Sequence, residues 1–269
     1  MKLSISNIAW DAKEDKTVYE YMTQCGFFGV EIAPTRWVQE APYDKVQQSK
    51  GIADTLKEQY GFCISSMQSI WFGRSERIFA GEAERKILSD YTKKAIDYAS
   101  AIGCKNLVFG CPRNRKIEEE WNLTNEKVMQ TAMDFFKELG DYAYEKGTVI
   151  GMEANPTIYN TNYVNTTAEA LELIEKVDSK GFLLNLDIGT MIQNEEDIKV
   201  LEGKIPVINH IHISEPGLKL IEKRELHKGL MQLLKEEKYD KFVSIEMGRQ
   251  EDVSVLKDVM QYVAEVYHD

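Results

Sequence analysis

Short apolar runs alternate with longer amphipathic stretches along the whole chain. The runs are five to seven residues long and rich in Ile, Val, Leu and Phe, which is typical of buried strands, whereas the stretches between them favour helices. We expect strands in LSISNIA (3–9), GVEIA (29–33), CISSMQS (63–69), NLVFG (106–110), TVIGMEA (148–154), FLLNLD (182–187), VINHIHI (207–213) and FVSIEM (242–247). We expect helices at 16–25, about 44–60, 82–102, 124–146, 167–177, near 195–201, 226–237 and 253–267.

Two of these helices carry start signals: Thr124 stands before one, and Thr166 with Glu169 has capping-box spacing before another. Eight strands that alternate with eight helices are typical of repeated βα units around a parallel sheet. We therefore predict the α/β class and a single domain over residues 1–269, folded as a (β/α)8 TIM barrel. The alternative is a doubly wound open sheet, which usually carries a Gly-rich phosphate-binding turn that this sequence lacks.

Four residues of metal-binding type stand at the ends of four consecutive apolar runs. They are Glu153, Asp187, His212 and Glu246, spaced 34, 25 and 34 residues apart. Because one βα unit of an eight-fold barrel takes about 30 residues, this spacing places one of them on each of strands five to eight. All four side chains are then expected to project into one shared site, a cup at the carboxyl ends of the strands.

The residues around this quartet agree with that arrangement, because side chains of a strand alternate between its two faces. Small or polar residues stand two positions before each member, on the same face: Gly151, Asn185, His210 and Ser244. Apolar residues stand one position before, on the face that covering helices would bury: Met152, Leu186, Ile211 and Ile245. A purely structural barrel interior would prefer bulky branched side chains, and a bound cation would remove the cost of burying unpaired carboxylates.

Three carboxylates and one imidazole suit a divalent ion, Mn²⁺ or Mg²⁺ in the first place and Co²⁺ or Zn²⁺ as alternatives. Such an ion can bind two adjacent oxygens of a hydroxy-ketone or hydroxy-aldehyde and stabilise the enediolate that forms when the α-proton leaves. Glu153 and Glu246 belong to strands five and eight, so they approach a bound sugar from different sides. We expect these two glutamates to be the catalytic acid/base pair.

Composition narrows the range of partners. The net charge of −11 argues against nucleic acid, which normally requires a basic surface, and favours a small solute. No apolar stretch approaches the roughly 20 residues that span a bilayer, and the N-terminus lacks the pattern of a signal peptide. We therefore expect a cytoplasmic protein that does not bind membranes, and in that compartment its four cysteines are expected to be free thiols.

Five further residues follow strand ends on the side of the predicted cup and are candidates for binding substrate. Arg113 and Arg115 could hold a phosphate or carboxylate, with a solvated loop salt bridge as the equal alternative. Glu31 and Glu215 could meet substrate hydroxyls or instead form ion pairs. Trp71 could pack against the C–H surface of a sugar or simply fill a loop.

The chain resembles the xylose-isomerase-like barrel superfamily, and within it the sugar phosphate isomerase/epimerase group. The resemblance covers essentially the whole length through GVEIAP, LVFGCPRNR, MEANP with the following TTAEALELI, NLDIGT, HIHISEP and YDKFVSIEM. It implies that the metal ligands are Glu153, Asp187, His212 and Glu246, and that the protein forms a homo-dimer or homo-tetramer. Ketose 3-epimerases of this group hold substrate with a His, an Arg and an acid at positions where this chain has Thr190, Leu218 and Tyr159. The resemblance therefore implies that the metal shell is kept and that the substrate differs.

The sequence favours a metal-dependent isomerase or epimerase of a sugar, sugar phosphate or related polyol. A dehydratase of an inosose or dehydroshikimate-like substrate is the alternative, because abstraction of the same α-proton followed by loss of a β-hydroxyl gives elimination. A nuclease such as endonuclease IV would need further histidines, and the chain has only four. A sugar-binding sensor without catalysis is the remaining class, and the retention of both glutamates argues against it.

Overall fold

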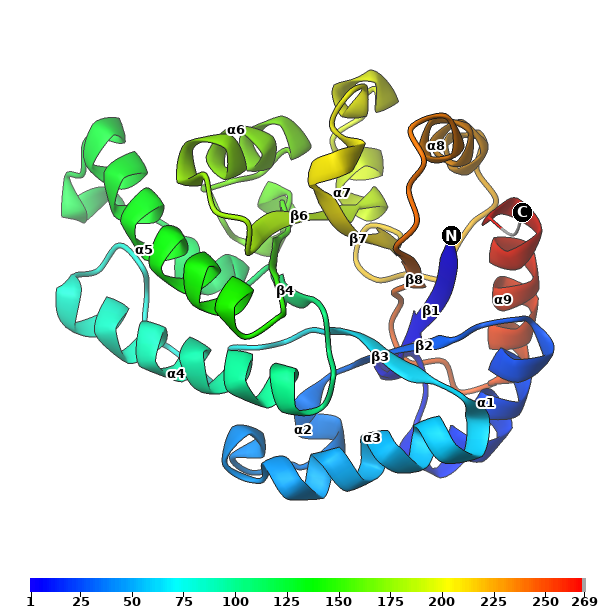
Figure 1. The fold of residues 1–269 in the computed structure, drawn as a ribbon. Helices are drawn as coiled ribbons and strands as arrows, with labels where there is room; N and C mark the ends of the chain where they lie inside the picture. The colour runs from blue at the N-terminus through cyan, green and yellow to red at the C-terminus, as the bar shows by residue number, and fades with distance from the viewer. Residues whose placement is uncertain (268–269) are drawn as a thin grey trace.

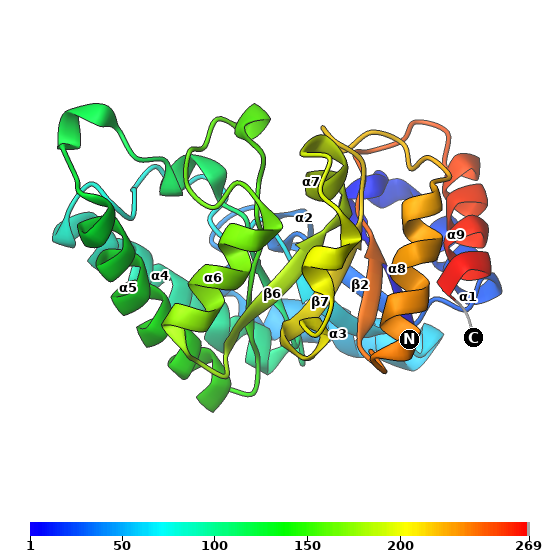
Figure 2. The ribbon, with the colours of Figure 1, turned by 90° about the horizontal axis from the view of Figure 1, so that it is seen from above.

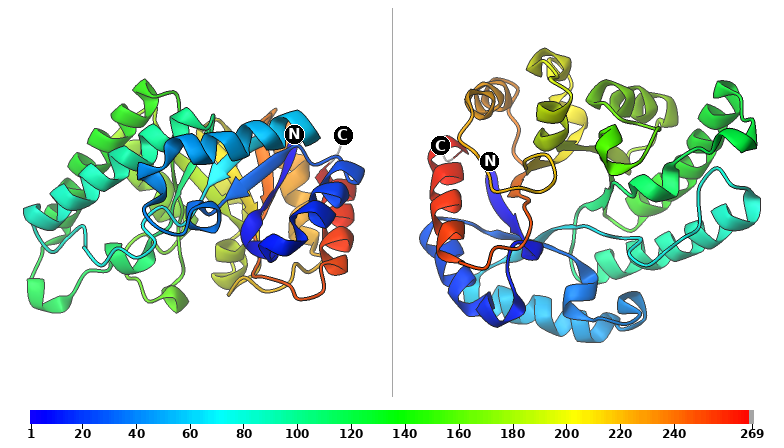
Figure 3. Two further views of the ribbon diagram at one scale, coloured as in Figure 1. Left: turned by 90° about the horizontal axis from the view of Figure 1, so that it is seen from below. Right: turned by 180° about the vertical axis from the view of Figure 1, so that it is seen from behind.

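The computed structural model describes residues 1–267 and contains eight parallel strands that close into one barrel in sequence order. The barrel closes because β1 pairs with β8 as well as with β2, so that the first strand lies on the same side of the molecule as α9 (Ser254–Tyr267) (Figures 1 and 3). The strands are β1 (Lys2–Ser6), β2 (Gly29–Ile32), β3 (Cys63–Met67), β4 (Leu107–Phe109), β5 (Ile150–Met152), β6 (Phe182–Asp187), β7 (Ile208–Ile213) and β8 (Phe242–Ile245). This is the predicted single-domain (β/α)8 TIM barrel.

The helices surround the strands, and the loops that follow the strands gather along one edge of the molecule (Figure 2, top). The α-helices are α1 (Asp15–Gln24), α2 (Pro34–Trp37), α3 (Val46–Tyr60), α4 (Glu82–Ala101), α5 (Asn125–Glu145), α6 (Thr167–Val177), α7 (Ile188–Gln193), α8 (Glu225–Glu236) and α9 (Ser254–Tyr267). Within residues 1–267, no helix is long and apolar enough to cross a membrane.

The expected helix near 195–201 is wrong. Only the 3-10 turn η7 (Ile198–Leu201) lies there, and the helix that covers this part of the barrel is α7, directly after β6. Asp187, the last residue of β6, is also the N-cap of α7: its carboxylate accepts a hydrogen bond from the backbone N–H of Thr190 at 2.8 Å. Because a single residue ends the strand and caps the helix, no turn separates the two elements in the sequence.

The two faces of the strands differ as the sequence predicts. Met152, Leu186, Ile211 and Ile245 face the helices and are at most 1% exposed. Inside the barrel, polar side chains bond to one another: Nδ2 of Asn106 donates to Oγ of Ser66 at 3.0 Å and to Oδ1 of Asn185 at 3.1 Å. Gly151 leaves room for this layer, since a Cβ there would lie 2.7 Å from Oδ1 of Asn106. The barrel interior is therefore polar beneath the strand ends.

The predicted capping box at the start of α6 is present. Oγ1 of Thr166 accepts from the backbone N–H of Glu169, and the Glu169 carboxylate accepts from the backbone N–H of Thr166, both at 3.2 Å.

We expect Thr166→Ala to lower the free energy of unfolding by about 1 kcal/mol, because an N-terminal donor of the helix loses its acceptor. Urea denaturation measures this. Thr55→Ala is the matched control, because that exposed hydroxyl only donates to the carbonyl of Gly51 within α3. Equal losses in the two variants would contradict the capping role.

Candidate functional site

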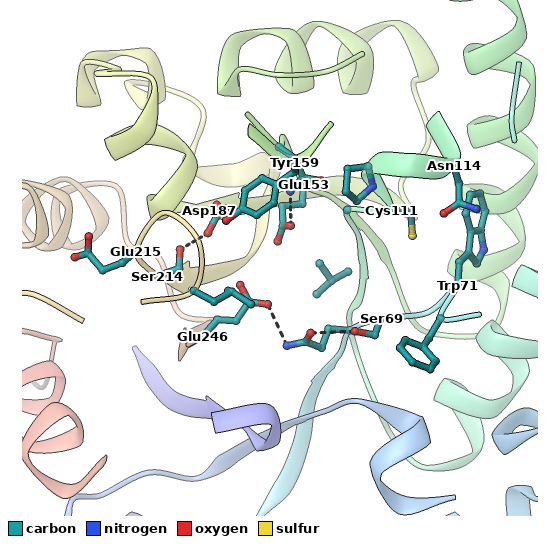
Figure 4. A pocket seen from close by; sticks show the side chains of 17 residues that line it. Ser69, Trp71, Cys111, Asn114, Glu153, Tyr159, Asp187, Ser214, Glu215 and Glu246 are labelled. Carbon is teal, nitrogen blue, oxygen red and sulfur yellow. Dashed lines mark hydrogen bonds between the residues drawn. The ribbon is translucent and has the colours of Figure 1, made fainter. Parts of the chain in front are cut away.

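A cavity of about 290 Å³ opens among the loops at the carboxyl ends of the strands. Its size is close to the lower end of the range for small-molecule sites, so it suits a small solute. Glu153, Asp187, Glu215 and Glu246 line it, together with Trp71 and twelve other residues (Figure 4). Glu153 and Glu246 each stand one residue beyond the end of their strands, β5 and β8, as expected of site residues in this fold.

His212 lies between the two glutamates. Its Nδ1 atom is 3.0 Å from Oε2 of Glu153 and 3.2 Å from Oε2 of Glu246. These three residues form one group whose potential ligand atoms all lie within 4.8 Å of one another. The structure thus brings three members of the predicted quartet into contact.

Asp187, the fourth member, lines the same cavity but stands outside this tight group. Its Oδ2 atom accepts from the backbone N–H of Thr190 at 2.8 Å and from Oγ1 of Thr190 at 2.7 Å. Its Oδ1 atom accepts a short hydrogen bond from Oγ of Ser214. Thr190 and Ser214 therefore hold this carboxylate at the edge of the site.

Polar side chains deeper in the barrel interior fix the ring of His212 on the side away from Glu153 and Glu246. Nε2 of His212 is 2.8 Å from Oε2 of Glu31, and Nε2 of His210 is 3.2 Å from the same oxygen. The pKa of Glu31 is held well below its usual value: burial would raise it, but His212 and His210 outweigh that effect. Since an ionised carboxylate only accepts, Nε2 of His212 donates to Glu31, and Nδ1, which faces Glu153 and Glu246, is the nitrogen that would bind a cation after losing its proton.

The expected role of Glu31 in binding substrate needs correction. Its side chain is fully buried inside the barrel and does not line the cavity, because the two histidines of β7 pair with it there. Gln68, directly after β3, links these buried side chains to the cavity. Its amide nitrogen Nε2 donates to Oε1 of Glu31 at 3.1 Å and to Oε1 of Glu246 at 3.0 Å.

Arg115 also needs correction as a substrate-binding residue. Its guanidinium is fully buried, where Nη1 donates to the carbonyls of Gly110 at 2.6 Å and Glu153 at 2.8 Å. Nη2 donates to Oδ1 of Asn155 at 3.0 Å and to the carbonyl of Val164 at 3.1 Å. The group therefore binds the β4 and β5 loops to each other instead of facing the cavity.

Of the three remaining candidates for binding substrate, two line the cavity and one does not. Arg113 is exposed and does not line it. Glu215 does line it, but its carboxylate accepts from Nε of Arg224 at 2.7 Å and from Nη2 at 2.5 Å, which is the ion-pair alternative. Trp71 lines the cavity as well.

Sequence reasoning missed the residues that orient the carboxylates. Nδ2 of Asn155 donates to Oε1 of Glu153 at 2.9 Å, and Nδ2 of Asn185 donates to Oε2 of Glu153 at 3.0 Å. Ser214 and Gln68 do the same for Asp187 and Glu246. A signal was present, since Asn155, Asn185 and Ser214 each stand two positions from a member of the quartet and share its face.

The electrostatics of the site reflect an excess of acid. Burial, with the charges of Glu153 and Glu31, raises the pKa of Glu246 to about 7, although His212 opposes this shift. Burial and Glu153 also raise the pKa of Asp187. Burial alone would lower the pKa of His212, but Glu246 and Glu31 raise it well above its usual value. No Lys or Arg within residues 1–267 lines the cavity to offset the carboxylates.

This donor set fits a divalent cation. Carboxylate oxygens and one imidazole nitrogen are ligands that Mn²⁺, Mg²⁺, Co²⁺ and Zn²⁺ accept. Burial and the neighbouring carboxylate of Glu153 raise the pKa values of Glu246 and Asp187, and a bound cation would lower both.

Comparisons with known proteins agree with the fold. A family model described as xylose isomerase-like TIM barrel matches residues 19–266. A search of curated proteins finds no match. Solved structures similar to the chain include 3-keto-D-glucoside 4-epimerase from E. coli, with 18% identity, a TM-score of 0.75, and 98% of this chain and 99% of that one covered.

A second similar structure is D-psicose 3-epimerase from Clostridium cellulolyticum H10, with 15% identity, a TM-score of 0.79 and 100% of each chain covered. A third is a probable 3-DHS dehydratase from Bacillus anthracis. The latter shares 14% identity over 100% of this chain and 99% of that one, with a TM-score of 0.69. At these identities, the similarity is one of fold.

Proposed function

We propose that this chain, which belongs to the xylose isomerase-like TIM barrel family, is a divalent-metal-dependent isomerase or epimerase of a sugar or related polyol. The observation that carries the proposal is the pair of carboxylates, Glu153 from β5 and Glu246 from β8, that flank Nδ1 of His212 at 3.0 and 3.2 Å over a small cavity. Glu153, Asp187, His212 and Glu246 would hold the ion. When bound, the ion would polarise a substrate carbonyl and so acidify the neighbouring C–H bond.

The two glutamates would move the proton. One carboxylate removes the proton from the carbon next to the carbonyl, and the other lies on a different side of the substrate and can return a proton there. Return to the opposite face of the same carbon inverts it, and return to the neighbouring carbon gives an aldose–ketose isomer. Hydrogen bonds from Asn155 and Asn185 to Glu153, and from Gln68 to Glu246, keep both carboxylates in place for this step.

The test is a panel of ketoses, aldoses, inososes and sugar phosphates, incubated with metal-loaded protein in deuterated water and followed by NMR. We expect deuterium to enter one C–H position of a panel member as its epimer or isomer forms. An unsaturated or deoxy product would instead identify a dehydratase, the reaction named for the Bacillus anthracis structure. Tight binding without exchange in any member would contradict the proposal and indicate a sugar-binding protein.

Metal binding is expected to strengthen as pH rises. Glu246, whose pKa is raised to about 7, must lose its proton to bind the ion, and so must His212, whose pKa is also raised. Loss of one proton from a group of this pKa increases Mn²⁺ affinity by about tenfold between pH 6 and pH 8, and His212 adds to the effect. Isothermal titration calorimetry at the two pH values, in buffers of different ionisation enthalpy, measures both affinity and proton release. An affinity that is unchanged or falls with pH would contradict this assignment.

A further inference from the structure

We infer that the substrate is an uncharged, unphosphorylated sugar whose end remote from the reacting carbons is apolar. This inference rests on the proposed function, because that function decides which end of the sugar lies among the carboxylates. The part of the cavity that receives the remote end is formed by Trp71, Phe72, Val108 and Pro112, which we call the apolar wall.

The charge of the cavity excludes a phosphate group. Four acidic side chains line it, and no Lys or Arg within residues 1–267 does so. Arg113 is exposed and does not line the cavity. Arg115 is buried and donates its hydrogen bonds to backbone carbonyls and to Asn155. A phosphate, with a charge of about −1.5 to −2 at neutral pH, would therefore enter an acidic site without a basic side chain to bind it.

The side-chain donors of Trp71, Asn114 and Ser69, near the apolar wall, are already used within the protein. Nε1 of Trp71 donates to Oγ1 of Thr92 at 2.8 Å, so the indole presents only carbon to the cavity. Nδ2 of Asn114 donates to the carbonyls of Arg74 at 3.2 Å and Glu76 at 2.8 Å. Oγ of Ser69 donates to Oε1 of Gln68 at 3.2 Å. The oxygen of a substrate hydroxyl on this side would lose the donors that water supplies without gaining one from these three side chains.

The cavity is thus polar on one side and apolar on the other. Figure 4 shows Trp71 and Asn114 on the side away from Asp187, Ser214 and Glu215. Trp71 is fixed by edge contacts with Phe109 at 4.7 Å and Phe135 at 6.1 Å between ring centroids, so its position does not depend on a ligand. Phe72 is 69% exposed although it lines the cavity. An apolar group on the substrate would cover this ring, which supplies the reason for a large aromatic side chain there.

The test uses ketohexoses of several configurations, each as the parent sugar, the 6-deoxy sugar and the 6-phosphate. Carbon 6 is remote from the carbonyl, so it samples the apolar wall. Dissociation constants for the metal-loaded protein are measured by calorimetry, and exchange is measured by NMR in deuterated water. For at least one configuration we expect the 6-deoxy sugar to bind about fivefold or more tightly than its parent, and the 6-phosphate about tenfold or more weakly.

Two variants test whether the apolar wall causes the tighter binding of the 6-deoxy sugar. Phe72→Ser is expected to reduce the preference for the 6-deoxy sugar to less than about twofold, because a small hydroxyl replaces the apolar ring. Phe28→Ser is the matched control: this ring is 56% exposed just before β2, at the opposite end of the barrel, so the preference is expected to remain. A preference that is the same in both variants would overturn the role of the wall.

The outcomes separate the inference from the proposed function. Exchange on a 6-phosphate that equals or exceeds exchange on the parent sugar would support the function and overturn the inference. A 6-deoxy preference in binding, without exchange on any sugar, would overturn the function and support the inferred ligand class. No 6-deoxy preference for any configuration that binds would overturn the inference.

Discussion

Glu246→Gln and Glu153→Gln are each expected to slow solvent exchange of the reacting C–H by about 10²- to 10⁴-fold, the usual contribution of a positioned acid or base. Glutamine keeps the shape of the side chain but cannot take up the proton. The fold should be retained, because the amide oxygen can still accept from Gln68 at position 246 and from Asn155 or Asn185 at position 153. Removing a carboxylate also lessens the acidic excess of the metal-free site.

Because both glutamates are also proposed metal ligands, exchange is measured by NMR over a titration of Mn²⁺ up to saturation. Loss of exchange that persists at saturation identifies an acid/base role, whereas full recovery would leave the residue as a ligand only. Glu265→Gln on α9 is the matched control, since that side chain is exposed and does not line the cavity. Exchange within about tenfold of wild type in both site variants at saturation would contradict the acid/base pair.

Arg115→Met is expected to lower the free energy of unfolding by about 3–5 kcal/mol, the range for large losses at buried polar sites. The substitution leaves the carbonyls of Gly110 and Glu153 and the amide oxygen of Asn155 without this donor, whereas the carbonyl of Val164 keeps only the backbone N–H of Asn155 at 3.2 Å. Burial lowers the pKa of Arg115 to about 10, yet the group remains charged at neutral pH. Its charge therefore strengthens these four hydrogen bonds.

Arg115 is also a positioning residue for the site, because Asn155, which it holds, donates to Oε1 of Glu153. In Arg115→Met we expect kcat to fall more than KM changes, with Arg115→Lys intermediate because an ammonium cannot reach both loops in the same fork. Arg113→Met is the matched control and should stay within about 0.5 kcal/mol of wild type, since Arg113 is exposed. Urea denaturation and steady-state kinetics measure the two effects. Equal stability and activity in the Met variants of positions 113 and 115 would contradict this role.

The sequence predicts the strands and the meeting of three residues of the site because both depend on periodicity. Alternation along a strand decides which side chains enter the barrel, and equal spacing of βα units decides which strand ends meet. Glu153, His212 and Glu246 satisfy both conditions and lie together. Periodicity does not predict helix α7, because the helix is only six residues long and Asp187 is both the strand end and the cap.

Burial of charged residues was not predictable in the same way. Arg113 and Arg115 are two positions apart in one short loop, yet one is exposed and the other fully buried, because the carbonyls that bind Arg115 come from separate loops. The sequence places Glu31 at the cavity, but its side chain is buried because its pairing with His210 and His212 joins β2 to β7 across the barrel. Such partners depend on tertiary contacts that no local pattern contains.

The proposed chemistry requires one divalent ion bound by the four strand-end residues, and anomalous diffraction from crystals equilibrated with Mn²⁺ tests this directly. We expect one manganese peak in the cavity, bonded to a carboxylate oxygen from each of Glu153, Asp187 and Glu246 and to Nδ1 of His212. Asp187 would then have turned from its hydrogen bonds with Thr190 and Ser214 toward the ion. No peak among these residues, or a peak at Glu31 and His210 instead, would contradict the account.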